Sequence, residues 1–558
     1  MSPSSLSIPG ILVLLGLWLC TKLFLLSRHG SHGPKLRGPP RSNLILGLST
    51  PPIKDAFYAE WVAQYGPVYE IPAALGRKKL VITDPTALLH VYNAERAVYT
   101  KSESSRTFLA RVFGRGILWA EGEVHKRQRR ALSPAFSNAA IRKLTAVFYD
   151  SVHKVKSYWD ETMESTSGDV IIDVEGWMNG IALDSVGIAG FSHDFRSLAG
   201  EESPVTRAFA ALQRNERTSF SELMFGLSFV FPIFLRVPTQ VMRLFWDMRH
   251  SLDVIAENLL ENTRREKEGM LPEGRTDKSL MGVLLKAEQE DADLQLRMTQ
   301  EEVAAQVRMQ SVFITRLTFC PADRSLVGWC VTLLSSSIIR LESKSPQDMR
   351  QHQWALMELA WHPETQDKLR KELDQFRVDP TWDQLVYELP FLNATVLEVL
   401  RLHPAVPETE RVAAHDDIIP LGTPITTLSG ETITSLTVAA GTAIILPIRC
   451  VNRSDEFWGA DAKAFRPERW FEEVTDRAKE LQGYHHLLTF HDGPRICLGR
   501  AFALAEIKAV ISVLIRHYVF EFPDGRETKI EEQEMLVSRP KVVGQDGTKI
   551  PLRVRRVE

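Results

Sequence analysis

The segment Phe490–Ala503, FHDGPRICLGRAFA, holds the residue types and spacing best suited to chemistry. Cys497 stands just before a predicted helix, where the positive end of the helix dipole and free backbone N–H groups favour a thiolate. Gly493 permits a tight turn, and Gly499 lets a flat group approach the backbone closely. Arg495 offers a fixed cation for an anionic group. A single cysteine is usually a small core residue, so the prediction depends on the whole pattern F-x-x-G-x-R-x-C-x-G.

This pattern resembles the cysteine loop of the cytochrome P450 superfamily, whose thiolate is an axial ligand of haem iron. The residues at its defined positions are Phe490, Gly493, Arg495, Cys497 and Gly499. The resemblance implies that Cys497 binds the iron of haem b and that the other residues of the loop contact the cofactor.

A second motif lies in ATVLEVLRLHP, where Glu398 and Arg401 are three residues apart and share a helix face. On a solvated face such a pair contributes under ~1 kcal/mol. Apolar neighbours predict that this pair is buried and needs a further partner, which FRPERW supplies at Arg469. The P450 family has the same elements in the same order. The resemblance implies that Glu398, Arg401 and Arg469 lock the core behind the haem, as structural rather than catalytic residues.

The two propionates of haem need cations. The run GEVHKRQRRALSPAF places His125 and Arg129 one turn apart on one helix face. Taken alone, this run would indicate a basic surface helix. The resemblance implies instead that His125, Arg129 and Arg495 bind the propionates, with Arg411 in PETERVAAHD as a further partner.

One family motif is absent. The family places A-G-x-E-T-T on a helix across the distal face of the haem, where a threonine and an acid relay protons to bound oxygen. Here a helix starts at MTQEEVAAQVR, with Thr299 and Glu302 as a capping box. The next helical pattern starts at Trp354, after a polar run without periodicity. Residues 309–353 hold no such motif, so no catalytic residue is assigned.

An error in the exon boundaries assigned to the gene would explain why the distal motif is missing. Codons exist for Pro346–Gln353 that encode A-G-Y-E-T-T-S when they are read from the third base of the proline codon. Arg308 and Met309 can be encoded by CGTATG, which contains an intron donor sequence. We hypothesise that residues 309–353 come from intron and out-of-frame exon sequence, an error of the gene model. The alternative is a genuine insertion that loops out.

The bulk composition fits a large globular enzyme. The chain has 558 residues, of which 44% are hydrophobic and 25% charged. The net charge of −3 does not suggest nucleic-acid binding. The five cysteines are widely spread, which disfavours zinc sites and a disulfide framework and fits a reducing compartment.

The first residues predict a membrane anchor, residues 1–27. Ile8–Leu26 is almost wholly apolar and close to the ~20 residues that span a bilayer. Basic residues come directly after it, so the positive-inside rule puts the rest of the chain in the cytosol. A cleaved signal peptide is the alternative, although its basic side would precede the apolar run. Residues 28–50 form a basic, proline-rich hinge.

Residues 51–558 are expected to form one large domain, mainly α with small β-sheets, of the α+β class and the P450 fold. Helical patterns dominate residues 120–300, strand-like runs come after Pro404, and a last long helix is expected from Arg500 to His517. The apolar segment 223–238 is interpreted as a core helix, or else as a membrane-dipping or substrate-entry segment.

By resemblance to membrane-bound fungal P450 enzymes, the protein is expected to be a haem-thiolate monooxygenase of the endoplasmic reticulum membrane, single-pass and by default monomeric. One oxygen atom of O2 would enter a lipophilic small molecule, in secondary metabolism or xenobiotic oxidation. Electrons would come from NADPH through a reductase. Two alternatives stay open: a haem-thiolate isomerase or dehydratase, and an inactive haem-binding product in case residues 309–353 are translated. The sequence does not identify the substrate or the regioselectivity.

Overall fold

A computed structural model describes most of the chain. The described residues are 33–43, 47–48, 55–73, 76–166, 169–191, 193–200, 224, 234, 236–267, 284, 296–315, 348–533, 539–545 and 549–557. The predicted anchor, much of the hinge, most of the apolar segment 223–238 and the middle of segment 309–353 lie outside them. No helix within these described ranges is long and apolar enough to cross a bilayer.

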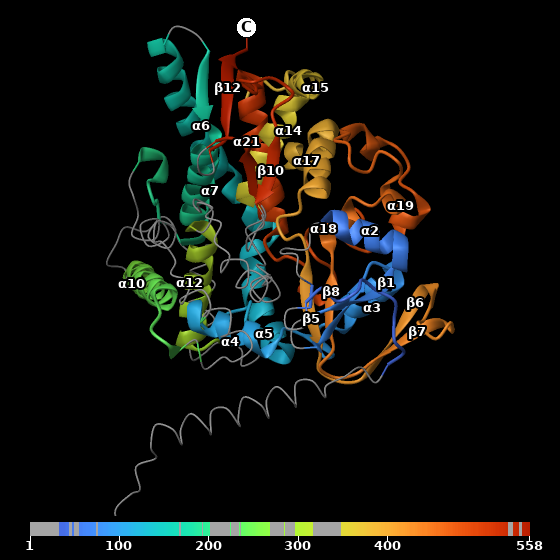
Figure 1. Cartoon of the computed structure of the whole chain (residues 1–558). Helices are drawn as coiled ribbons and strands as arrows, with labels where there is room; N and C mark the ends of the chain where they lie inside the picture. Colours follow the sequence, from blue (N-terminus) through green and yellow to red (C-terminus); the bar gives the residue numbers. More distant parts are fainter. Residues whose placement is uncertain are drawn as a thin grey trace, which may run out of the picture.

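The described body is mainly helical, with small sheets in more than one region of the molecule (Figure 1). This confirms the predicted class. The α-helices are α2 (Asp55–Tyr65), α3 (Pro85–Ala94), α4 (Glu103–Val112), α5 (Gly122–Leu132), α6 (Asn138–Thr166), α7 (Val174–Phe191), α10 (Gln240–Lys267), α12 (Gln300–Thr315), α14 (Asp348–Trp361), α15 (Pro363–Leu373), α16 (Trp382–Tyr387), α17 (Pro390–Leu402), α18 (Ile448–Asn452), α19 (Asp455–Trp458), α20 (Asp476–Lys479) and α21 (Arg500–His517). Short 3-10 helices are η2 (Ser133–Phe136), η3 (Ser197–Ala199), η5 (Pro467–Phe471) and η6 (Gly493–Arg495).

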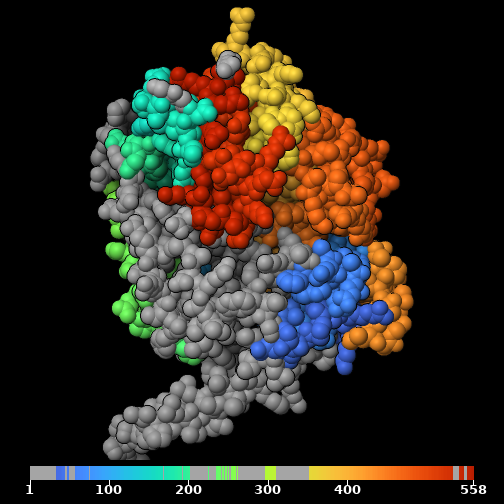
Figure 2. Space-filling model, turned by 45° about the horizontal axis from the view of Figure 1, so that its top comes forward, coloured from blue at the N-terminus to red at the C-terminus, as the bar shows by residue number. Residues whose placement is uncertain are grey.

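The core is centred on α21, which packs against α6, α14, α15 and α17. Ala505–Ile515 is buried all round. A largely apolar helix of this kind is buried when other elements cover all of its faces, and α21 has the residues predicted for the last long helix. Figure 2 shows the C-terminal residues (red) between the teal segment that contains α6 and the yellow and orange segments that come after residue 348. Segments from both halves of the chain therefore cover this core.

The strands form one five-stranded sheet and three smaller ones. The large sheet has the order β1-β2-β8-β5-β3, with a parallel pair where Leu80 lies opposite Ile444. In the same sheet Arg411 of β5 lies opposite Ile444 of β8, so β8 joins the N-terminal strands to the strand that carries Arg411. The strands are β1 (Val68–Pro72), β2 (Lys78–Ile82), β3 (Tyr99–Thr100), β4 (Val170–Asp173), β5 (Thr409–Ala413), β6 (Asp417–Thr426), β7 (Thr432–Val438), β8 (Ala443–Leu446), β9 (Tyr518–Glu521), β10 (Ile530–Gln533), β11 (Arg539–Val542) and β12 (Pro551–Arg556).

The predicted start of the helix at Trp354 is wrong, because α14 begins at Asp348. The polar residues Gln351, His352 and Gln353 are buried rather than exposed. Gln351 donates from Nε2 to the backbone oxygen of His403 at 2.6 Å, and Gln353 donates to Oδ1 of Asn179 at 3.1 Å. Partners from other helices therefore allow these side chains to be buried, although the local pattern has no apolar face.

Candidate active site

The cysteine loop starts at Phe490, contains η6 and leads into α21. Gly499 is the N-cap of α21, so Cys497 precedes the helix by a short step, and its side chain is buried. The backbone N–H of Cys497 donates to the backbone oxygen of Phe490 at 2.8 Å, which closes the loop. The sulfur is thus located at the positive end of a buried helix, where a thiolate is favoured.

Gly493 holds the loop against α3. Its φ is +63°, and a Cβ atom on it would lie 2.6 Å from the backbone oxygen of Tyr92. Both the left-handed backbone and this close approach require glycine. Phe490 is also buried and its ring meets that of Tyr484 edge-on, with 6.1 Å between centroids. The loop is therefore fixed on the N-terminal side of Cys497.

Two of the predicted cations, Arg411 and Arg495, meet at one buried carboxylate, that of Glu95. Nη2 of Arg411 lies 2.5 Å from Oε1 of Glu95, and Nε of Arg495 lies 3.9 Å from Oε2. His491 completes the group, because its Nε2 lies 2.8 Å from Oε1. Burial lowers the pKa of Arg411 and that of Arg495, and the charge of Glu95 opposes both shifts.

A second carboxylate, that of Glu121, lies on the other side of Arg495. Its Oε2 pairs with Nη2 of Arg495, and its Oε1 lies 2.9 Å from Nζ of Lys101. Burial lowers the pKa of Lys101 well below its usual value, and the nearby charges of Arg495 and Arg411 lower it further. Cationic side chains from several elements thus converge beside the cysteine loop.

The other two predicted cations are on α5. His125 belongs to the buried face of this helix, with Gln128, Ala131 and Leu132, while Arg129 is half-buried. Burial lowers the pKa of Arg129, and a charge interaction with Cys497 opposes that shift. The helix therefore turns one face inward, in contrast to a wholly exposed basic helix.

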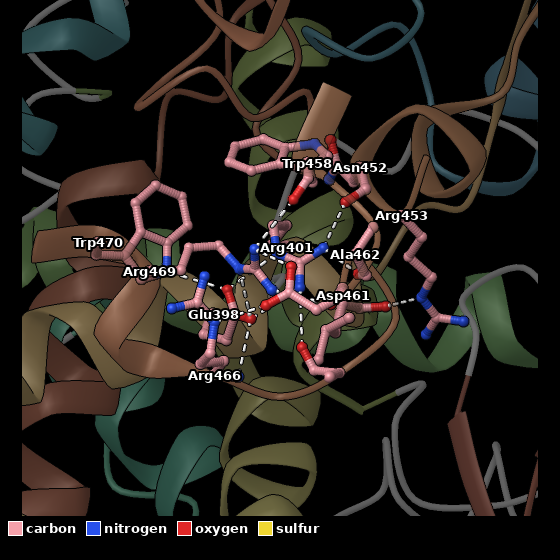
Figure 3. Close-up of polar contacts among 12 residues, drawn as sticks. Glu398, Arg401, Asn452, Arg453, Trp458, Asp461, Ala462, Arg466, Arg469 and Trp470 are labelled. Atoms are coloured by element: carbon pink, nitrogen blue, oxygen red, sulfur yellow. Dashed lines mark hydrogen bonds and ion pairs between the residues drawn. The ribbon is translucent and has the colours of Figure 1, made fainter. Parts of the chain in front are cut away.

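The Glu398, Arg401 and Arg469 side chains are brought together in the core (Figure 3). Arg401 forms a two-bonded pair with Glu398, with Nε to Oε2 at 2.9 Å and Nη2 to Oε1 at 2.8 Å. Nε of Arg469 donates to Oε1 of Glu398 at 3.1 Å. Glu398 and Arg401 are 0% exposed, so each charge depends on its partners.

Further groups that no motif indicated complete this network. The indole of Trp470 and the backbone N–H of Arg466 donate to Glu398 at 3.1 and 3.0 Å. Arg469 also pairs with Asp461, at 2.9 Å. Arg401 donates to the backbone oxygen of Asn452 at 2.9 Å. The network therefore joins α17 to the end of α18, to the loop that carries Asp461 and to η5.

The start of α12 is held by a similar set of contacts. The backbone N–H of Thr299 donates to Glu302 at 2.9 Å and that of Glu302 donates to the Thr299 hydroxyl at 3.2 Å, which confirms the predicted capping box. Arg127 of α5 forms a two-bonded pair with Glu302, at 3.0 and 2.5 Å. Gln306 donates to Gln128 at 3.0 Å. Helix α12 is therefore tied to the helix that carries His125 and Arg129.

The residues missed by sequence reasoning are Glu95, Glu121, Lys101 and His491. Two of them had a visible signal: His491 is the residue directly after Phe490 inside the cysteine loop, and Glu121 directly precedes α5. Glu95 and Lys101 had none, because only the fold brings them to the loop.

These residues fit haem b. The cofactor needs a thiolate for its iron and cations for its two propionates. The described residues supply Cys497 at a helix N-terminus and, beside it, the buried guanidinium groups of Arg411 and Arg495. A helical fold with this donor set defines the class of haem-thiolate proteins.

Comparison with known proteins gives the same class. The family model for cytochrome P450 matches residues 43–310 and 352–544. The chain belongs to the cytochrome P450 family, and its activity is that of an oxidoreductase, a haem-thiolate monooxygenase.

Named relatives match nearly the whole chain. Cytochrome P450 monooxygenase claO of Ampulloclitocybe clavipes is 48% identical over 558 residues, 98% of each chain. Cytochrome P450 monooxygenase claW of the same fungus is 46% identical over 561 residues, 99% of this chain and 98% of its own. Cytochrome P450 monooxygenase 205 of Postia placenta is 32% identical over 545 residues, 93% of this chain and 92% of its own.

The family match is interrupted once. The first matched part ends at residue 310 and the second begins at residue 352, so residues 311–351 lie between them. This interval lies inside segment 309–353, where the distal motif is missing.

Proposed function

We propose that the protein oxidises a lipophilic small molecule, in secondary metabolism or xenobiotic oxidation, with electrons from NADPH delivered by a reductase. The observation that carries the proposal is the buried Cys497 at the N-terminus of α21, beside Arg411 and Arg495. Membership of the P450 family supports the chemistry. The apolar N-terminal run supports a single-pass anchor in the endoplasmic reticulum membrane with a cytosolic catalytic domain.

Each site residue has a distinct role in this proposal. Cys497 holds the iron through its sulfur, and the dipole of α21 stabilises the negative charge on that sulfur. Arg495, Arg411, Arg129 and His125 bind the propionates. When bound, haem supplies the activation of O2 and the transfer of one oxygen atom to the substrate.

The supporting residues keep this arrangement rigid. Phe490, Gly493 and Gly499 shape the cysteine loop. The Glu398 network holds α17 in register with the segment that leads to the loop, because Arg401 and Arg469 contact backbone oxygens of Asn452 and Asp461. No described residue is assigned to proton delivery.

The test of the thiolate is a substitution at Cys497 with a matched control at Cys450. Both cysteines are buried. The full chain would be produced in a fungal host and its reduced, carbon monoxide-bound spectrum recorded. We expect the red-shifted band of thiolate-ligated haem in wild type and in Cys450→Ser, and its loss in Cys497→Ser. Retention of the band in Cys497→Ser would refute the assignment.

The electron source and the location have separate tests. Microsomes that contain the full chain should consume NADPH only when a P450 reductase is added or co-expressed. A fluorescent fusion should mark the endoplasmic reticulum, and deletion of residues 1–27 should release it from the membrane fraction. NADPH consumption without the reductase would contradict the assigned electron source. A truncated protein that stays in the membrane fraction would contradict the assigned anchor.

A second candidate function is favoured by one specific observation, the missing distal motif in segment 309–353. A chain translated as written would be an isomerase, a dehydratase or an inactive haem-binding product. Transcript sequencing across the codons for Val303–Glu364 separates the two. A shorter message that encodes A-G-[YH]-E-T-T-S before WALMELA supports the monooxygenase, and a message that encodes all of 309–353 supports the second candidate.

A further inference from the structure

Glu95 occupies a position that is electrostatically unfavourable by itself. It is the C-cap residue of α3, so its carboxylate meets the negative end of the helix dipole. It is also 0% exposed, and burial of a charge is costly unless the charge is paired. The ion-pair partners described for this carboxylate lie on other elements.

Those elements are β5 and the cysteine loop. Oε1 of Glu95 faces Arg411 at 2.5 Å and His491 at 2.8 Å, while Oε2 faces Arg495 at 3.9 Å. The two arginines are far apart in the sequence, both are buried, and they would repel each other without an anion between them. Glu95 therefore lies between two like charges beside the same loop, while Glu121 pairs with Arg495 alone of the two.

The charge of Glu95 also favours the charged form of Arg411. Burial lowers the pKa of Arg411, and the first group that opposes the shift is Glu95. A neutral residue of the same shape at position 95 would keep contacts to both arginines but would remove this support.

We propose that Glu95 is a positioning residue for haem: it orients Arg411 and Arg495 toward the propionates and places a fixed negative charge next to them. This inference rests on the proposed assignment of the two arginines to the propionates. It predicts that Glu95 controls how long haem is retained and at what potential its iron is reduced, although Glu95 does not touch the iron.

The experiment compares Glu95→Gln, Glu95→Asp and wild type as full-length, haem-loaded proteins. The matched control is Glu410→Gln, which removes a charge from β5 next to Arg411, at a carboxylate that pairs with Lys79. The rate of haem loss to an excess of an apo-globin scavenger and the midpoint potential of the iron are measured for each protein.

We expect Glu95→Gln to lose haem about tenfold faster, since tenfold corresponds to one charged hydrogen bond. Its midpoint potential should rise, because a nearby negative charge is removed. Glu95→Asp keeps the charge on a shorter side chain, so its haem loss should be intermediate and its potential close to wild type. Glu410→Gln should match wild type in both.

Equal haem loss in all four proteins would overturn the inference. Faster loss in both Glu95 variants without any change of potential would also overturn it, because that result describes a helix cap and not a charge at the haem. If Glu95→Gln does not accumulate, Glu95→Asp is sufficient: a rate of haem loss equal to wild type would refute the role. If wild type itself shows no thiolate-ligated haem, the proposed function fails instead, so the two failures are distinguishable.

Discussion

Two glutamates, Glu398 and Glu302, organise two regions of the molecule in the same manner but with different partners. Glu398 on α17 binds side chains and backbone groups between residues 401 and 470, all in one continuously described stretch. Glu302 at the start of α12 binds Arg127 and Gln128 of α5, more than 170 residues away. The Glu398 partners thus come from a short stretch of sequence, whereas the Glu302 partners come from a distant helix.

The two regions also differ in the sequence on their C-terminal side. The chain after α17 continues through β5 to the cysteine loop without a break in the family match. The chain after the start of α12 enters segment 309–353, where the match is interrupted. The described start of α12 is therefore well anchored, and the sequence beyond it is the part that departs from the family.

The largest effect is expected at Glu398. Glu398→Ala leaves Arg401 as a buried cation without its anion and leaves Arg469 with Asp461 alone, which costs about 3–5 kcal/mol. We expect the full-length variant to yield little or no haem protein, measured as the ratio of haem to protein after purification. Glu468→Ala, a half-exposed carboxylate paired with Lys368, is the matched control and should keep wild-type haem content. Normal haem content in Glu398→Ala would show that the network is dispensable.

A smaller effect of opposite sign is expected at Lys508, a buried cation on α21. Burial lowers the pKa of Lys508 to about 8, and Glu372 only partly opposes this. Lys508→Met should raise the free energy of unfolding at pH 7 by up to about 3 kcal/mol, at 1.36 kcal/mol per pKa unit. The measurement is denaturant unfolding as a function of pH.

The pH dependence of this gain has a definite sign. Since the folded pKa is below the ordinary value of 10.5, the unfolded chain binds more protons between about pH 8 and 10.5. Wild type should therefore become more stable as the pH rises through this range, and the advantage of Lys508→Met should disappear above it. An advantage that persists at high pH would indicate packing rather than charge as the cause.

The Glu302 region should be less sensitive than the Glu398 region, because Arg127 is 26% exposed and water can replace part of the pair. We expect Glu302→Gln to lose about 1.5–3 kcal/mol of unfolding free energy at pH 7, the range for hydrogen bonds to charged groups. Glu301→Gln, in the same first turn but exposed, is the control. A loss as large as that of Glu398→Ala would remove the contrast between the two regions.

This loss also depends on pH. Burial raises the pKa of Glu302, but bonds from Arg127, Thr299 and Gln128 outweigh it and the net pKa is lowered from 4.5. A carboxyl with a lowered folded pKa stabilises the protein above its ordinary pKa, and this stabilisation is lost as the pH falls through the folded value. The difference between wild type and Glu302→Gln should therefore shrink below about pH 4.5.

The smallest effect is expected on the surface. Lys154 and Asp194 form a pair at 3.4 Å with both side chains 40% exposed or more. Lys154→Ala should change the free energy of unfolding by under about 1 kcal/mol, since solvent screens such pairs. Added salt should reduce the change further. A larger effect would mean that the exposed fraction of an ion pair does not predict how much that pair stabilises the protein.

The parts predicted correctly from sequence are those set by local spacing. The bounds of α21 result from a continuous apolar pattern, and the capping box of Thr299 and Glu302 results from a separation of three residues. The short distance between Glu398 and Arg401 on one helix face has the same origin. In each case the backbone geometry alone brings the groups together.

The parts missed are those that depend on tertiary contacts. Glu95 and Lys101 reach the cysteine loop only because α3 packs against η6 and β3 pairs with β5. The start of α14 was misplaced because Gln351 and Gln353 are buried against partners in other helices. A periodicity argument treats such polar residues as solvent-exposed, so it starts the helix too late in the sequence.

The first turns of α14 also bear on the alternative reading frame. Two of its amide side chains donate to the backbone oxygen of His403 and to the side chain of Asn179. The alternative frame puts threonine, threonine and serine over the codons of residues 350–353. Hydroxyl groups, like amides, can donate hydrogen bonds. Both frames therefore encode hydrogen-bond donors for this part of the chain.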